Sequence, residues 1–162
     1  MIKLLFVLAS TLTACTAPVG LQNLHEVDPG KVYRSAQPDA DGYKQLKAMG
    51  VKSVIKFNSE KEDEEIGWAR ANGIKLYYYP LSGLLSPGEV NTRKIQYMMN
   101  SKELQPLLIH CEWGKDRTGL QAALYRVHTM HWDPNAAFKE WMDYGHSGLL
   151  FPMDGFFWKH AK

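Results

Sequence analysis

The chain has 162 residues, enough for one domain with a sizeable core, and its 45% apolar and 22% charged residues are typical of a globular protein. Its 19 basic and 17 acidic side chains nearly balance, and they form no basic tail or stripe. The sequence therefore carries no electrostatic signature of nucleic-acid binding, and no nucleic-acid partner is expected.

The first residues of the chain differ from the rest. Lys3 gives a short positive start, residues 4–12 are almost wholly apolar, and small residues follow. This pattern is typical of a secretory signal peptide, which is too short to stay in a bilayer as a spanning helix. The letters LTAC at residues 12–15 resemble the lipobox of bacterial lipoproteins, which implies that Cys15 is lipidated and becomes the first mature residue.

We therefore expect a signal peptide over residues 1–14, a tether over residues 15–29, and an exported bacterial lipoprotein that acyl chains anchor to a membrane. A signal peptide cut elsewhere and a buried first strand are the alternatives. Thr16 is not the Asp associated with inner-membrane retention, so a host with two membranes would hold the protein at the outer membrane, facing the periplasm. Cys15 and Cys111 are the only cysteines, so lipidation of the first leaves the second without an intramolecular disulfide partner.

From residue 30 onward, short apolar strands alternate with amphipathic helices. In chain order, the expected elements are a strand at 31–34, a helix at 41–49, a strand at 51–57, a helix at 60–72, a strand at 74–81, a helix at 86–101, a strand at 107–109, helices at 118–130 and 134–144, and a short helix near 156. This alternation predicts one α/β domain over residues 30–162, in which helices flank a mostly parallel sheet of four to five strands.

Local signals set the expected ends of several helices. Gly73 is expected to close the helix at 60–72, whose acidic start suits the positive end of a helix dipole and is interpreted as a solvated face. The helix at 86–101 begins with Ser-Pro-Gly-Glu, the pattern of a capping box with proline in the first helical position. Asp133 is the expected cap of the helix at 134–144.

The loop after the last strand carries the chemistry. It lies at the carboxyl end of a central strand, where α/β sheets bind ligands, and reads CEWGKDR over residues 111–117. Five residues separate Cys111 from Arg117, so the loop can curl until both side chains face one point. Inward backbone N–H groups and the start of the next helix then form an anion site that suits a phosphate. Gly114 permits backbone angles that a side chain would forbid, and Gly119 allows close helix packing.

Two side chains of this loop have clear chemical tasks. Cys111, among inward N–H groups and near a guanidinium, is expected to have a lowered pKa and to be a thiolate at neutral pH. A thiolate is a strong nucleophile that needs no separate base. Arg117 offers a planar fork that can bind two phosphoryl oxygens, which a lysine would do less well.

The stretch HCEWGKDRTG resembles the His-Cys-x5-Arg-Ser/Thr signature of cysteine-dependent protein tyrosine and dual-specificity phosphatases. Upstream, VYRSAQP, GVKSVIKFNSE and YYYPL resemble, in order and spacing, the atypical dual-specificity phosphatases of bacteria, plants and fungi. The resemblance covers roughly residues 31–145. It implies a three-layer phosphatase-like domain over residues 30–162 that hydrolyses phosphate monoesters, with no metal and no cofactor.

The resemblance also implies a role for each residue of the loop. Cys111 attacks phosphorus to give a phosphocysteine, which water then hydrolyses. Thr118 hydrogen-bonds the cysteine sulfur and helps it leave, and His110 orders the loop. The residues that surround the phosphate are Glu112, Trp113, Gly114, Lys115, Asp116 and Arg117.

One departure from the family pattern concerns the general acid. Most of these phosphatases take it from an Asp on a separate upstream loop, but no Asp occurs between Asp63 and Asp116. Asp116 is the best candidate, since loops with an Asp before the Arg in myotubularin-like and some secreted bacterial tyrosine phosphatases use that Asp as acid. The alternative is an Asp that only pairs with Lys115 or a neighbouring basic group. Glu89 is a weaker candidate, because the capping box already explains it.

The resemblance further implies that the substrate is a phosphorylated protein or a small-molecule or lipid phosphate. Lys115 widens the positive field and suits substrates with several phosphates, such as phosphoinositides or inositol phosphates, although Glu112 opposes it. Trp113 either stacks on an aromatic or inositol ring or packs at the rim.

Other readings of the loop stay open. A lipid-anchored pseudophosphatase that binds phosphorylated ligands without turnover fits the missing upstream Asp, although Cys111 and Arg117 are intact. A rhodanese-type sulfurtransferase also cradles a cysteine, but its loop usually lacks the His-Cys start and the Arg-Thr end. His128 and His131 lack a third ligand at metal spacing and are interpreted as helix-surface residues.

Overall fold

The computed structural model describes residues 20–162, and the expected signal peptide, lipobox and Cys15 lie outside the described residues. The strands are β1 (His25–Asp28), β2 (Val32–Ser35), β3 (Ser53–Lys56), β4 (Lys75–Tyr78) and β5 (Leu107–His110). The helices are α1 (Ala40–Ala48), α2 (Glu62–Asn72), α3 (Glu89–Met99), α4 (Asp116–His128), α5 (Pro134–Asp143) and α6 (Phe151–His160). Within residues 20–162, no helix combines the length and the apolar character that crossing a bilayer requires.

The strands form one sheet in the order β1-β2-β5-β3-β4. β5 lies in the centre and pairs in parallel with β2 on one side and with β3 on the other, with Leu107 opposite both Val32 and Ser53. β4 is parallel to β3, and β1 alone among these strands runs antiparallel. The predicted α/β fold with a mostly parallel sheet of four to five strands is therefore confirmed.

The expected tether is wrong in its second half. Residues 25–28 form β1, which pairs with β2 and extends the sheet by an edge strand. The sequence of this strand shows no clear alternation of apolar and polar residues, because only Val27 is fully buried. Leu21, before the strand, also lies in the core. So short a strand depends on its partner for hydrogen bonds, and such pairing leaves little trace in the local sequence.

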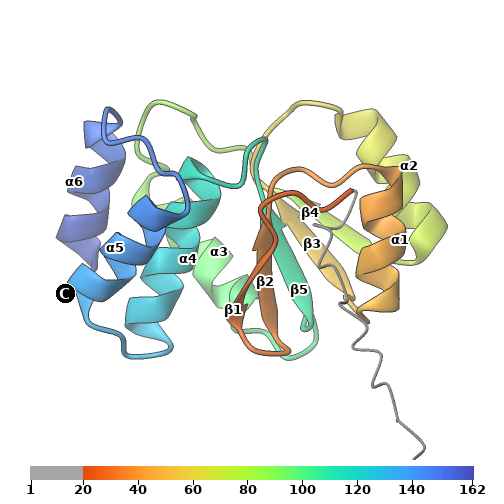
Figure 1. Cartoon of the computed structure of the whole chain (residues 1–162), viewed down its shortest axis with the longest axis horizontal. Helices are drawn as coiled ribbons and strands as arrows, with labels where there is room; N and C mark the ends of the chain where they lie inside the picture. Colours follow the sequence, from red (N-terminus) through yellow and green to blue (C-terminus); the bar gives the residue numbers. More distant parts are fainter. Residues whose placement is uncertain (1–19) are drawn as a thin grey trace, which may run out of the picture.

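Helices cover both faces of the sheet (Figure 1). α1 and α2 pack on one face around Tyr43, Leu46 and Ala69, and α3 and α4 pack on the other around Ile95 and Met99. A third apolar cluster joins α4, α5 and α6, so the last two helices lie on the outer side of α4 and away from the sheet. Helix α4 is thus buried on two sides, and almost all of its residues from Thr118 to Arg126 are inaccessible to solvent.

Two of the expected helix ends are confirmed and one is wrong. Gly73 closes α2 in the left-handed conformation, and the carboxylate of Asp133 accepts hydrogen bonds from the first N–H groups of α5. Helix α3 instead begins at Glu89, without a side-chain cap, and Ser86 lies before the helix. The Glu89 carboxylate binds Lys159 of α6 at 2.8 Å, so a contact between distant helices replaces the expected capping box.

Candidate active site

The loop with Cys111 leaves the central strand β5 at the edge of the sheet that is uppermost in Figure 1. All four residues of β5 are buried between β2 and β3, so the start of the loop has a fixed position. Cys111 follows at once and is only 3% exposed. Helix α4 begins at Asp116, two residues earlier than expected, and directs its N-terminal end at the loop.

Four successive backbone carbonyls of the loop accept hydrogen bonds from donors that lie outside it. These are Gln37 N to Glu112 O (3.2 Å), Asn23 Nδ2 to Trp113 O (3.2 Å), Arg34 Nη2 to Gly114 O (2.7 Å) and Trp141 Nε1 to Lys115 O (3.1 Å). In a trans peptide, the C=O and the following N–H point in opposite directions, so the outward carbonyls of residues 112–115 leave the N–H groups of residues 113–116 to face inward. None of these N–H groups donates to an acceptor within residues 20–162. The loop is therefore a preformed set of hydrogen-bond donors for an anion.

Two glycines let the loop pack this closely. Gly114 has φ of +70°, and a Cβ on it would lie 2.5 Å from the backbone of Ser35 and Ala36. A Cβ on Gly119, in the first turns of α4, would overlap the indole ring of Trp141. Any larger side chain would thus push the loop away from the end of β2 or α4 away from α5.

A buried polar network supports the start of the loop from below. Nε2 of His110 lies 2.7 Å from Oε1 of Glu65, and Oε1 also accepts a hydrogen bond from the Tyr43 hydroxyl at 2.8 Å. Oε2 accepts from Lys56 Nζ at 2.5 Å and from Gln37 Nε2 at 2.7 Å. Burial alone would raise the pKa of Glu65, but His110 and Lys56 outweigh it and lower the pKa to about 2.

The prediction that the acidic start of α2 is a solvated face is therefore wrong for Glu65, which is fully buried. A signal for this existed in the helical period. Glu65 stands four residues before the buried Ala69 and shares its face of the helix.

Arg34 lies beneath the loop and is 1% exposed. Besides its bond to Gly114, its guanidinium packs over the ring of Tyr144 at 4.9 Å. Nε and Nη1 have no partner within the described part of the chain. Burial lowers the pKa of Arg34 to about 10, still far above neutral, so the loop rests on a buried positive charge that suits an anion.

The two residues after Asp116 also lie at the site. Arg117 is half-buried beside Gly83 and makes no hydrogen bond or ion pair within residues 20–162, which leaves its fork available to a ligand. Thr118 is fully buried, and its hydroxyl has no partner in the same range. It forms no hydrogen bond with Cys111 in this structure.

Asp116 lies in the first turn of α4, and its Oδ1 contacts two residues of the segment between α5 and α6. This oxygen accepts a hydrogen bond from the backbone N–H of Ser147 at 2.9 Å and lies 2.7 Å from Nδ1 of His146. Burial alone would raise the pKa of Asp116, but these two partners and the charges of His146 and Arg117 lower it. The carboxylate is thus paired with a histidine and not with Lys115.

The rim of the site holds the remaining predicted residues. Trp113 is 61% exposed, Lys115 is exposed, and Glu112 is half-buried. The upstream loop at 79–88 contains no carboxylate, and the Ser82 hydroxyl there accepts hydrogen bonds from two N–H groups of its own loop.

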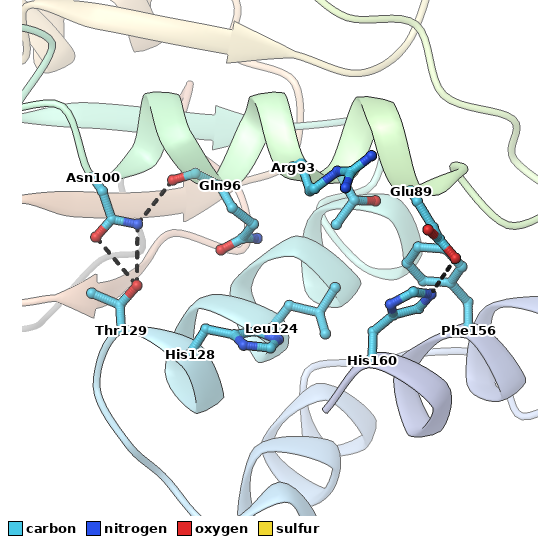
Figure 2. A pocket seen from close by; sticks show the side chains of 10 residues that line it. Glu89, Arg93, Gln96, Asn100, Leu124, His128, Thr129, Phe156 and His160 are labelled. Carbon is cyan, nitrogen blue, oxygen red and sulfur yellow. Dashed lines mark hydrogen bonds and ion pairs between the residues drawn. The ribbon is translucent and has the colours of Figure 1, made fainter. Parts of the chain in front are cut away.

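A separate cavity of about 340 Å³ lies between α3, α4 and α6. Figure 2 shows Arg93, Gln96 and Glu89 from α3 opposite His128 of α4 and His160 of α6. None of its lining residues belongs to the loop at 111–117. Among residues 20–162, no three His, Cys, Asp or Glu side chains lie close enough together to bind a metal ion.

His146 is a site residue that the sequence did not indicate. It stands in the short stretch Gly145-His146-Ser147-Gly148, which looks like an exposed turn, yet its side chain is fully buried. The partners that give it a role lie 30 residues before it and eight residues after it. No local pattern could have indicated that contact.

The relatives of this chain are phosphatases. It is 33% identical over 127 residues to the dual specificity protein phosphatase TpbA of Pseudomonas aeruginosa, covering 78% of this chain and 56% of TpbA. It is 30% identical over 127 residues to the inositol diphosphatase DSP2 of rice, Oryza sativa, covering 75% of this chain and 61% of DSP2. The chain thus spans little more than half the length of these two relatives.

Solved structures show the same fold. The core catalytic domain of the PP-IP phosphatase SIW14 from Saccharomyces cerevisiae, in complex with citrate, matches with a TM-score of 0.76 at 24% identity, over 87% of both chains. P. aeruginosa TpbA matches with a TM-score of 0.72 at 25% identity, over 87% of this chain and 90% of that one.

The sequence model of the tyrosine phosphatase family matches residues 18–151, which include the whole loop, its supporting network and Asp116 with its histidine partner. The chain therefore belongs to the tyrosine phosphatase family, among its cysteine-dependent atypical dual-specificity members.

Proposed function

We propose that this protein hydrolyses phosphate monoesters through a phosphocysteine at Cys111. The observation that carries the proposal is the outward binding of the four loop carbonyls by Gln37, Asn23, Arg34 and Trp141. It leaves a ring of inward N–H donors around a cysteine at a helix N-terminus, which is the arrangement that stabilises a phosphoryl group during transfer.

The proposed reaction has two displacements. The Cys111 sulfur attacks phosphorus, a P–S bond forms, and the P–O bond breaks with its electron pair going to the leaving oxygen. Water then attacks phosphorus, and the P–S pair returns to sulfur, with Thr118 as the proposed hydrogen-bond donor to that sulfur. Arg117 and the loop N–H groups hold the phosphoryl oxygens throughout both steps.

Asp116 is the proposed proton-transfer group. In the first step, its protonated form gives a proton to the leaving oxygen, and in the second step its carboxylate takes one from the attacking water. Because its pKa is lowered, the protonated form is scarce at neutral pH. We expect this protein to favour leaving groups that need little protonation, such as p-nitrophenol, over phenol and alkyl alcohols.

The proposed substrates follow from the relatives and from the rim. TpbA is a dual specificity protein phosphatase, and one of its solved structures holds phosphotyrosine, whereas DSP2 and SIW14 are inositol diphosphatases. The exposed Trp113 offers a ring for stacking, and Lys115 offers a charge for a second phosphate. A panel of phosphotyrosine peptides, phosphoinositides and inositol polyphosphates would rank these classes.

The test of the proposal uses p-nitrophenyl phosphate. We expect hydrolysis that vanadate inhibits and EDTA does not affect, and we expect Cys111→Ser to be inactive but still able to bind phosphate. Phosphate binding without turnover by the wild type would point to a pseudophosphatase. Activity that EDTA removes and an added metal restores would exclude the phosphocysteine mechanism.

The proposed location is a membrane surface reached by export, with Cys15 as the lipidated residue. The proposal rests on the apolar segment at residues 4–12 and on the lipobox pattern that follows it. We expect the wild type in the membrane fraction and Cys15→Ser in the soluble fraction. A wild-type protein recovered from the cytosol would defeat this proposal and leave the proposed activity untouched.

A further inference from the structure

His146 is held between two carboxylates at the edge of the active site. Its Nδ1 lies 2.7 Å from Oδ1 of Asp116, and its Nε2 lies 2.6 Å from Oδ1 of Asp154 on α6. The imidazole side chain is fully buried and stacks on the indole of Trp141, with centroids 3.8 Å apart. The position of the ring is therefore fixed on both edges and on one face.

The contacts also favour the protonated form of the ring. An ionised carboxylate only accepts hydrogen bonds, so each ring nitrogen that faces one carries a hydrogen, and the ring is an imidazolium. Burial alone would lower the pKa of His146, but the hydrogen bonds and charges of Asp116 and Asp154 raise it. The other charged groups nearby are Lys115, whose side-chain carbons pack against Gly145, and Arg117.

We propose that His146 is a positioning residue for proton transfer. As an imidazolium anchored by Asp154, it holds one oxygen of Asp116. The other oxygen of Asp116 is then free to exchange a proton with the leaving oxygen or the attacking water beside Cys111. The inference rests on the proposed phosphatase function. In the second displacement, the water proton passes to the free oxygen of Asp116 as the P–S electron pair returns to sulfur. In the first displacement of the following turnover, Asp116 gives that proton to the leaving oxygen. The imidazolium of His146 is unchanged throughout.

The positive charge of His146 then sets the pH at which Asp116 loses its proton. A step that needs protonated Asp116 slows as the pH rises through the pKa of this carboxyl. An adjacent cation lowers a carboxyl pKa by one to three units, so removing it moves that fall in rate to a higher pH by about one unit. The effect is confined to leaving groups that need a proton, such as phenol, and spares p-nitrophenol.

The experiment measures kcat/KM against pH with phenyl phosphate and with p-nitrophenyl phosphate. His146→Gln keeps a hydrogen-bond donor to Asp116 but removes the positive charge. Asp154→Asn keeps an acceptor for Nε2–H but removes the negative charge that favours the imidazolium. For both variants, we expect the fall in phenyl phosphate activity to move about one pH unit upward. Asp143→Asn is the control, because this exposed carboxylate on α5 pairs only with Lys139 in the described structure.

The result that overturns the proposal is an unchanged pH profile with equal rate losses for both substrates, which is the outcome of a purely structural role. If His146→Gln does not fold, Asp154→Asn still decides the matter. An independent reading comes from NMR titration of the ring nitrogens of His146 in Cys111→Ser. A neutral ring at pH 7 defeats the inference even if the phosphatase is active, whereas an inactive wild type with a charged ring defeats only the proposed function.

Discussion

At the scale of single residues, the site depends on close contacts that particular side chains, or their absence, make possible. Gly114 and Gly50 both have positive φ, +70° and +77°, but only Gly114 has backbone atoms where a Cβ would be placed. The pair therefore separates the cost of the backbone angle from the cost of a clash.

We expect Gly114→Ala to reduce kcat/KM on the order of 100-fold, because a displacement of about 1 Å in a positioned site has effects of that size. Gly50→Ala, with open space around it, is expected to cost about 1 kcal/mol of stability and to leave kcat/KM unchanged. Steady-state kinetics with p-nitrophenyl phosphate and urea unfolding measure both quantities. Equal activity in the two variants would show that the loop does not need its packing against β2.

Replacing Glu65 should cause a large loss of stability. Glu65→Gln leaves the buried Lys56 without a compensating charge, so we expect a loss of about 3 kcal/mol in the free energy of unfolding at pH 7. Glu64→Gln, on the exposed side of the same helix, is the matched control and is expected to change stability by less than about 0.5 kcal/mol.

The same carboxyl predicts a pH dependence of stability. Its pKa is lowered to about 2 in the folded state, so its contribution is complete above its unfolded value of about 4.3 and is lost as the pH falls from there toward 2. Urea unfolding of the wild type and of Glu65→Gln should therefore converge as the pH approaches 2.

At the scale of elements, one arginine joins three segments on the far side of α4. Arg126 pairs with Glu140 of α5 at 2.6 Å, donates to the backbone carbonyls of Val27 and Glu26 in β1, and packs on Trp132. The edge strand β1 is thus attached to the helices as well as to β2.

For Arg126→Met, we expect a loss of about 3 kcal/mol in stability, because the change leaves Glu140 unpaired and removes a donor from two β1 carbonyls. Amide hydrogen exchange should show the largest loss of protection in β1. Lys139→Met removes an exposed ion pair on α5 and is expected to have no measurable effect. Similar exchange in β1 for both variants would contradict the attachment.

At the scale of the whole molecule, ligand binding at the loop should stabilise the entire fold. An anion that binds only the folded state raises its stability by about 2.7 kcal/mol at 100 times its Kd. We expect orthovanadate to raise the Tm of the wild type and to raise that of Arg117→Lys much less. Arg93→Lys, in the separate cavity of Figure 2, should respond like the wild type, and an equal loss of response in both variants would place the anion elsewhere.

How far the sequence predicted the molecule depends on the range of each signal. The strand-to-helix loop was predictable because Cys111, Gly114 and Arg117 lie within seven residues at the end of an apolar strand. β1 and the start of α3 were not, since β1 depends on pairing with β2 and Glu89 is held by Lys159, 70 residues away. His146 was missed for the same reason.

The four donors that turn the loop carbonyls outward also have a consequence for synthesis of the protein. Asn23, Arg34 and Gln37 are made before β5, whereas Trp141 is made after β5 and α4 are complete. On the ribosome, the nascent chain therefore holds Cys111 for some time before Trp141 can bind the last of the four carbonyls. We therefore expect the complete loop only once α5 has emerged, so the signature sequence alone is not sufficient to form the phosphate site.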